Sequence, residues 1–354
     1  VLYYIGIFIS DLASTGVTGP AFQGVPYADV EALFPGMIGD GPMTVGLNIA
    51  FLLLTLVFVA RGVSGGIEKV AVYLMPTFFV LLIAITIYGL FTGASAQAIT
   101  YLFTFEPEKL TGEVMLAAVG QAFFSLSLGV AGMVTYGAYV GRDVNLAGTS
   151  TIIAAADTSV ALIAGLCIFP IVFAAGLEPN GGLGLMFQTL PHAFQEIPFG
   201  SLIGLAFFIM VAFAALTSSV ALMEVPSAWV IERFKVSRLV GVGVVTGGAV
   251  VLGALSALST GAMADFHPLG FLPLFEGMGV LDTLDTFTSK LTMPICALLT
   301  AVFVGWIADK RLTDEENGLS GGLHLFWRFL VCWLCPLALT AILIVGIFPS
   351  VLGE

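Results

Sequence analysis

Two short polar segments interrupt long apolar stretches of the chain, and their residue types could bind a small ligand and a cation. The first is Gly120-Gln121-Ala122-Phe123-Phe124-Ser125-Leu126-Ser127-Leu128-Gly129. Glycine permits a helix to unwind locally, and the carbonyl and amide groups freed by unwinding can serve a buried ligand. Close packing between helices also favours small residues. Both interpretations stay open from the residue pattern alone.

The second segment is Ala214-Ala215-Leu216-Thr217-Ser218-Ser219. Two adjacent hydroxyls and the carbonyl one turn earlier would form a compact oxygen cluster, and an alkali cation needs several such neutral oxygens in place of its water shell. Alternatively, each hydroxyl bonds only to the backbone carbonyl one turn back, as serine and threonine in membrane helices often do. The segment taken alone favours this second interpretation.

Acidic residues also occur within apolar stretches. Asp157 lies several residues inside the stretch 150–176, where a charge at membrane depth costs about 2.5–3.5 kcal/mol and usually serves ions or protons. The alternative is an aspartate that is protonated, or bonded to the backbone, near the interface. Asp282 and Asp285 are three residues apart and share one helical face. Alone, this pair is typical of a solvated rim.

Features typical of enzymes are weak. The spacing in Cys332-Trp333-Leu334-Cys335 is that of a redox motif, but it lies in an apolar helix. The three histidines, His192, His267 and His324, lack metal-ligand spacing. The sequence contains no nucleophile elbow, Walker loop or dinucleotide fingerprint. We therefore expect no enzymatic activity.

The composition indicates which elements position these residues. Of 354 residues, 58% are apolar and 10% are charged, and the mean hydropathy is +1.07. A soluble fold has about 25% charged residues, so this chain is expected to lie in a lipid bilayer. A net charge of −12 argues against a nucleic-acid partner, and four cysteines do not make a disulfide framework.

Apolar stretches of about 20 residues can cross the hydrocarbon core as helices. Such stretches occur after a short segment at 1–10, namely at 43–60, 70–92, 113–140, 150–176, 200–231, 237–258, 281–308 and 323–348. They do not alternate in polarity as barrel strands do. The sequence therefore predicts an all-α polytopic membrane protein with about eight full transmembrane helices.

Basic residues indicate the orientation, because cytoplasmic loops are rich in lysine and arginine. Eight of the eleven basic residues fall in alternate loops: Arg61, Lys69, Arg142, Arg233, Lys235, Arg238, Lys310 and Arg311. That face is predicted to be cytoplasmic. The loops 11–42 and 177–199 then lie outside the cell, and we expect short helices between turns in the second of them.

Four motifs in order resemble the neurotransmitter:sodium symporter family, particularly its bacterial amino-acid transporters of the LeuT fold. They are Gly120–Gly129, Thr135-Tyr136-Gly137-Ala138-Tyr139, Ala214–Ser219 and Glu232–Arg238. The resemblance implies one transmembrane domain over residues 1–354, built as part of an inverted-repeat fold. Residues 1–10 resemble the end of the third helix and 43–348 resemble helices four to eleven. We expect the first two helices and most of the third to precede Val1.

The resemblance assigns a substrate site for an amino acid. Tyr4 resembles a tyrosine that bonds the substrate carboxylate, and Phe124 resembles an aromatic lid. Ser127, Val130 and Leu222 would line the side-chain pocket, with Ser125 and Ser218 beside the substrate. Because family members often carry a larger residue where Val130 stands, we expect a bulky hydrophobic or aromatic substrate.

The resemblance also assigns two sodium sites, each completed by residues of the first helix. The Ala214 carbonyl, Thr217 and Ser218 resemble the second site, whereas Ser125 and Asp157 resemble ligands of the first. Asp157 also resembles the acidic residue that replaces chloride in bacterial members. Near Gln121 and Ser125, its carboxylate would supply the balancing negative charge that chloride supplies in animal members. Chloride is therefore not expected to be required.

Two gates follow from the same resemblance. Asp285 resembles the outer acid, and Glu232 with Tyr139 resembles the inner gate; both gates pair with arginines expected before Val1. The implied activity is sodium-coupled symport of an amino acid by alternating access in the cell (inner or plasma) membrane, with a homodimer as a possible assembly. A proton-coupled transporter that uses Asp157, or a homologue that binds without transporting, are the alternatives.

Overall fold

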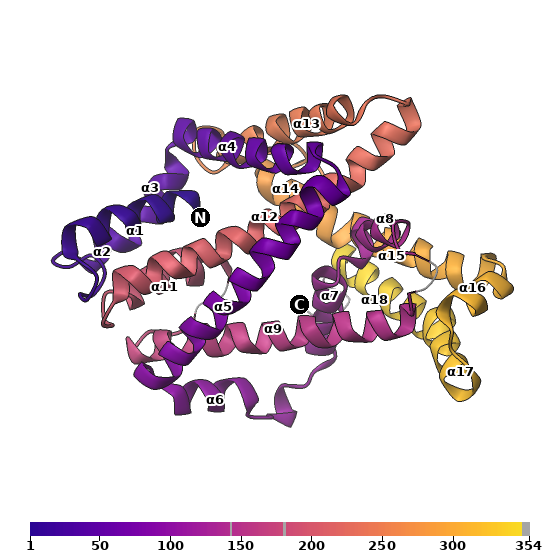
Figure 1. Ribbon diagram of the computed structural model, residues 1–354, viewed down its shortest axis with the longest axis horizontal. Coiled ribbons are helices and arrows are strands. Elements are labelled where there is room, and N and C mark those ends of the chain that lie inside the picture. The colour runs from indigo at the N-terminus through magenta and orange to yellow at the C-terminus, as the bar shows by residue number, and fades with distance from the viewer. Residues whose placement is uncertain (142–143, 180–181, 349–354) are drawn as a thin grey trace. The chain divides into compact units, whose positions relative to one another are not determined.

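The computed structural model describes residues 1–141, 144–179 and 182–348 (Figure 1), and every regular element assigned in this part of the chain is a helix. Within these described ranges, seven helices are long and apolar enough to cross a membrane. They are Gly41–Ala60, Val63–Thr92, Leu146–Ala174, Gly200–Phe234, Arg238–Ser259, Val280–Ile307 and Gly321–Ile347. The predicted polytopic α-helical fold is confirmed. Arg142 of the predicted cytoplasmic face lies outside the described residues.

The eighth predicted span, 113–140, is interrupted rather than continuous. Helix α7 (Gly112–Ser125) ends near the middle of the predicted span, a 3-10 turn η3 (Leu128–Val130) follows, and α8 (Gly132–Gly137) resumes the helix. The first helix, α1 (Leu2–Thr15), runs five residues beyond the expected segment 1–10. The predicted short helices in 177–199 are present as α10 (Gly182–Gly184), η4 (Leu185–Thr189) and α11 (Leu190–Ala193).

The chain forms two compact units, and residues Val1–Thr104 and Val160–Asp265 make up the first. Its long central helix α12 (Gly200–Phe234) packs against α1, α4 (Gly41–Ala60), α5 (Glu68–Thr92) and α13 (Arg238–Ser259). Its further helices are α2 (Tyr27–Glu31), α3 (Leu33–Gly39), the π-helical turn η1 (Val63–Ile67), α6 (Ser95–Phe103) and the second half of α9 (Leu146–Ala174).

Aromatic side chains form the core of the first unit where α1 meets α12. Phe8 is fully buried, and its ring centroid lies 5.5 Å from that of Phe208 and 5.0 Å from that of Phe22. Gly204 permits this close contact, because a Cβ atom there would lie 2.2 Å from the Phe8 ring. A second apolar cluster around Val220 joins α12 to α4 and α13. Helix α12 is thereby fixed along its length.

Residues Phe105–Ser159 and Phe266–Glu354 make up the second unit. It contains η2 (Pro107–Lys109), α7, η3, α8, the first half of α9, η5 (Pro273–Phe275), α14 (Val280–Thr286), η6 (Phe287–Thr292), α15 (Met293–Val302), η7 (Phe303–Ile307), α16 (Lys310–Asn317), α17 (Gly321–Phe329), η8 (Leu330–Leu334) and α18 (Cys335–Ile347). Helix α15 packs against α18 and against the turn η3. The interrupted helix therefore packs against other elements of the second unit.

Cys332 and Cys335 belong to a packing contact in this unit rather than to a disulfide. All four cysteines of the chain are free thiols. The Trp306 indole donates to the Cys332 carbonyl at 3.1 Å, and its ring meets Trp333 edge to face at 5.2 Å. Cys332 therefore lies in a contact with the segment of Trp306.

Candidate functional site

The break after α7 is a defined conformation with two left-handed residues. Ser127 has φ 53° and Ala131 has φ 58°. A side chain in this conformation costs roughly 1–2 kcal/mol, so the surrounding packing must hold it. We expected glycine to supply the freedom to unwind. Instead, the non-glycine residues Ser127 and Ala131 adopt the left-handed geometry, and the glycine of the turn has another role.

Gly129 allows the break to approach the backbone of α15. A Cβ atom at Gly129 would lie 2.4 Å from the carbonyl oxygen of Met293. Since no side chain fits there, the turn η3 rests directly on the first residue of α15. This contact fixes the position of Ser127 and Val130, two of the predicted pocket residues, which are half-buried on either side of Gly129.

The last residue of α7 pairs with the acidic residue of α9. The Ser125 hydroxyl donates to Asp157 Oδ2 at 2.9 Å. These two predicted sodium ligands come from sequence positions 32 apart and meet within one unit. A hydroxyl and a carboxylate at this distance offer oxygen ligands to a cation. Gln121 lies one turn earlier on α7 and is exposed, and no hydrogen bond joins it to Asp157 within the described residues.

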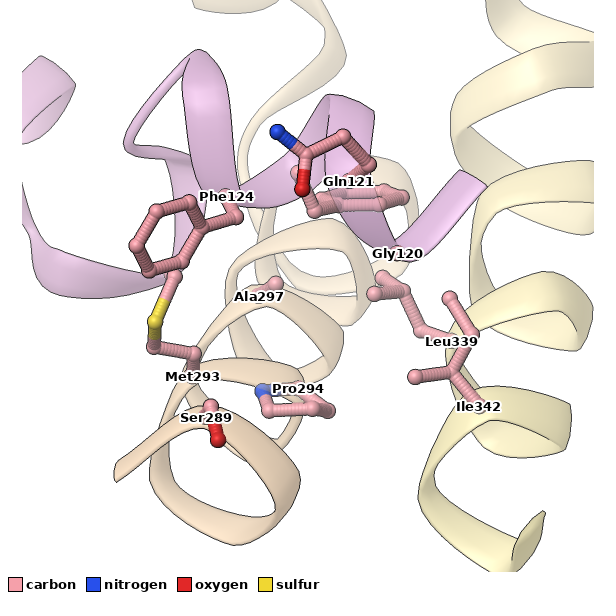
Figure 2. Close-up of a pocket in the computed structure, with 11 residues that line it drawn as sticks. Gly120, Gln121, Phe124, Ser289, Met293, Pro294, Ala297, Leu339 and Ile342 are labelled. Atoms are coloured by element: carbon pink, nitrogen blue, oxygen red, sulfur yellow. The ribbon is translucent and has the colours of Figure 1, made fainter. Parts of the chain in front are cut away.

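A cavity of about 240 Å³ lies beside the break. Its walls are mainly apolar and come from α7, η3, η6, α15 and α18, with Gly120, Gln121, Phe123, Phe124, Gly129, Ser289, Met293, Pro294, Ala297, Leu339 and Ile342. Figure 2 shows the Phe124 ring beside the Met293 side chain, with Leu339 and Ile342 on the opposite wall. Phe124, the predicted lid, is 58% exposed. The predicted lid therefore lies at the edge of the cavity and is mostly exposed.

The hydroxyls of α12 point in different directions. Thr217 Oγ1 lies 2.9 Å from the Ala214 carbonyl and 3.1 Å from the Phe213 carbonyl. Ser219 instead meets Thr55 of α4 at 2.9 Å. Ser218 is exposed, and no side-chain hydrogen bond is recorded for it in the described part of the chain. Two of the three predicted oxygens, those of Ala214 and Thr217, thus lie together.

Tyr4 has a different environment from that of an open binding site. It is fully buried, its ring stacks on Phe208 at 4.7 Å, and its hydroxyl donates to the carbonyl of Phe187 in η4. Leu222, by contrast, is 52% exposed on α12. The predicted contact between Tyr4 and a substrate carboxylate therefore requires the Tyr4 hydroxyl to leave Phe187.

The predicted gate residues lie at the ends of helices. Asp285 on α14 and Glu232 near the end of α12 are exposed, and neither joins an ion pair within the described ranges. Tyr139 follows α8 and is 47% exposed, and its ring lies 6.3 Å from that of Tyr136. Both carboxylates can therefore accept a basic partner.

A buried ion pair near the predicted cytoplasmic face was missed from the sequence. Glu224 on α12 is fully buried, and Arg238 at the start of α13 contacts both its oxygens, at 2.6 and 3.2 Å. The Arg238 Nε also donates to the Val59 carbonyl at 2.9 Å. The available signal was a carboxylate inside the predicted span 200–231, the criterion that singled out Asp157.

The chain is similar in sequence to known proteins. The chain matches the sequence profile of the Sodium:neurotransmitter symporter family over residues 29–351. It is 34% identical over 342 residues to an uncharacterized sodium-dependent transporter of Bacillus subtilis, and the aligned region makes up 94% of this chain and 72% of that protein. An uncharacterized sodium-dependent transporter of Haemophilus influenzae is 29% identical over 313 residues, or 88% of this chain and 67% of that one.

A solved structure extends the similarity to three dimensions. The crystal structure of MhsT in complex with L-phenylalanine matches with a TM-score of 0.84 and 33% identity, over 98% of this chain and 76% of that chain. A match of this quality over nearly the whole chain confirms the expected LeuT-type fold. This multi-pass membrane protein therefore belongs to the sodium:neurotransmitter symporter family, a family of sodium-dependent transporters.

Proposed function

We propose that this chain carries out sodium-coupled symport of an amino acid into the cell by alternating access. The observation that carries the proposal is the hydrogen bond of 2.9 Å between Ser125 and Asp157 at the end of a broken helix. Broken helices at membrane depth are tolerated where they line a cavity or are wrapped in protein. Here the break places a hydroxyl beside a carboxylate, next to a cavity of about 240 Å³.

Sodium provides the driving force in this proposal. One charge that crosses a membrane potential of 100 mV releases about 2.3 kcal/mol, enough for roughly fiftyfold accumulation of a solute. Coupling requires that sodium and substrate favour the same closed state, so that neither alone drives closure. Ser125 with Asp157, and Ala214 with Thr217 and Ser218, are the proposed ligands of two sodium ions.

Asp157 has a second role in the proposal, because its carboxylate supplies the negative charge that balances sodium. Chloride is then not required. Proton coupling through the same carboxylate is the alternative, since the hydrogen bond from Ser125 can be made to a protonated or an ionised Asp157. Sodium-free uptake driven by a proton gradient would identify that alternative.

The proposed substrate is a bulky hydrophobic or aromatic amino acid. L-phenylalanine is bound in the MhsT structure, and Val130 stands where family members often carry a larger residue, which would enlarge the pocket. In competition assays on the intact transporter, we expect tryptophan, tyrosine and leucine to compete better than alanine and glycine. The opposite ranking contradicts this pocket assignment.

The direct test is uptake by the intact transporter in proteoliposomes with sodium, potassium or choline outside. We expect accumulation in sodium alone. Replacing Thr217 by valine removes a proposed ligand and should weaken sodium activation at least about tenfold, in line with the loss of a buried polar contact. Ser219→Ala is the matched control, because the Ser219 hydroxyl faces Thr55 instead. Equal accumulation in choline would overturn the proposal.

A further inference from the structure

Four side chains outside the membrane-spanning helices join the loop 11–42 to the loop 177–199. The short helices α2 and α11 pack together (Figure 1). His192 of α11 places its Nδ1 atom 3.4 Å from a carboxylate oxygen of Glu31, and its ring lies 4.4 Å from the Tyr27 ring. The Tyr27 hydroxyl donates to the Glu196 carboxylate. We call these four residues, Tyr27, Glu31, His192 and Glu196, the loop cluster.

The Nδ1 atom of His192 is the incompletely satisfied group of the loop cluster. It is buried and has no hydrogen bond of good geometry, although the Glu31 carboxylate is within ion-pair distance. A neutral ring with its proton on Nε2 points a lone pair at that carboxylate, which is repulsive, and a neutral ring with its proton on Nδ1 carries no charge that would attract the carboxylate. Protonation places an N–H at Nδ1 and a positive charge beside the carboxylate and the Tyr27 ring, and both contacts then become attractive.

Among the described residues of the elements that pack against α11, no other titratable group opposes this change. Tyr27 keeps its proton across the physiological range, because its hydrogen bond to Glu196 raises its pKa above 10. The turn η4, which also packs against α11, carries no ionisable side chain. Asp29 is exposed on α2 and has no recorded contact with His192 in the described residues. Glu31 and Glu196 are therefore the carboxylates that face the imidazole.

The loop cluster lies next to the element that covers Tyr4. The turn η4 precedes α11 directly, and its Phe187 accepts the Tyr4 hydrogen bond and stacks on Phe34 of α3 at 5.1 Å. We propose that His192 is a proton-operated latch: acidification outside the cell tightens the docking of α11 on α2 and holds Phe187 over Tyr4. The effect on transport rests on the proposed function, whereas the effect on docking does not.

Hydrogen exchange on the intact transporter in nanodiscs tests the docking. The amides of 27–31 and 190–194 are followed at about pH 8 and about pH 6, after correction for intrinsic exchange. Acidification should increase their protection about two- to fivefold, the range that a half-exposed ion pair supplies. His192→Gln and Glu31→Gln should abolish the increase. Asp29→Asn, which removes the same charge from the same helix, should retain it.

Two results would overturn the latch: a pH-dependent increase that survives in His192→Gln, or one that Asp29→Asn removes as fully as Glu31→Gln does. Uptake into proteoliposomes with a fixed internal pH provides the separate functional arm. We expect external acid to slow uptake in the unmodified protein and not in His192→Gln. Absence of uptake at every pH, with the exchange pattern intact, rejects the proposed function and leaves the latch standing.

Discussion

The ion pair between Glu224 and Arg238 provides a quantitative test of how α12 and α13 are held together. Arg238→Met removes the guanidinium and keeps an apolar stem of similar length. Glu224 is fully buried, so its carboxylate would lose both charged contacts while staying out of water. Breaking a buried pair from one side costs about 3–5 kcal/mol. Because the Arg238 side chain is 29% exposed, we expect a loss at the lower end of this range, about 3 kcal/mol. This corresponds to more than a hundredfold decrease in the ratio of folded to unfolded protein.

Equilibrium unfolding with SDS in mixed micelles measures this cost. The double variant Glu224→Leu with Arg238→Met should recover most of the loss, since replacing a buried ion pair by hydrophobic residues is often neutral. Glu232→Gln, which changes an exposed carboxylate on the same helix, should stay within about 0.5 kcal/mol. The reasoning is refuted if Arg238→Met costs less than about 1 kcal/mol, or if the double variant is as unstable as the single one.

Two further substitutions test the break and the charge balance. Gly129→Ala places a Cβ atom 2.4 Å from the Met293 carbonyl and should destabilise the protein by about 1–3 kcal/mol in thermal unfolding. Gly120→Ala is the control, because a Cβ atom there has nothing within 4 Å and should not destabilise the protein. Equal effects of the two substitutions would argue against the close contact at Gly129. Asp157→Asn removes the proposed balancing charge, so uptake should become dependent on chloride. Uptake by that variant that is unchanged when gluconate replaces chloride would contradict this role.

The sequence was sufficient to determine the class of the protein and the approximate positions of the seven long apolar helices that the described residues form. Hydropathy depends on composition along the chain, so long apolar stretches identify membrane helices without knowledge of their neighbours. The interruption of 113–140 was one of the two interpretations that the residues Gly120–Gly129 left open. The reason for it was only partly correct, because Ser127 and Ala131 carry the left-handed backbone and Gly129 serves the contact with α15.

The pairing of side chains between helices was decided by the tertiary structure. Thr217 and Ser219 are two residues apart, yet one bonds within α12 and the other meets Thr55 of α4. Ser125 and Asp157 meet because of the way α7 ends and α9 is turned. Rotation of each helix about its axis depends on packing with its neighbours, and a local sequence pattern does not specify it. The sequence therefore identified the polar groups within the membrane, and only the folded chain determined their partners.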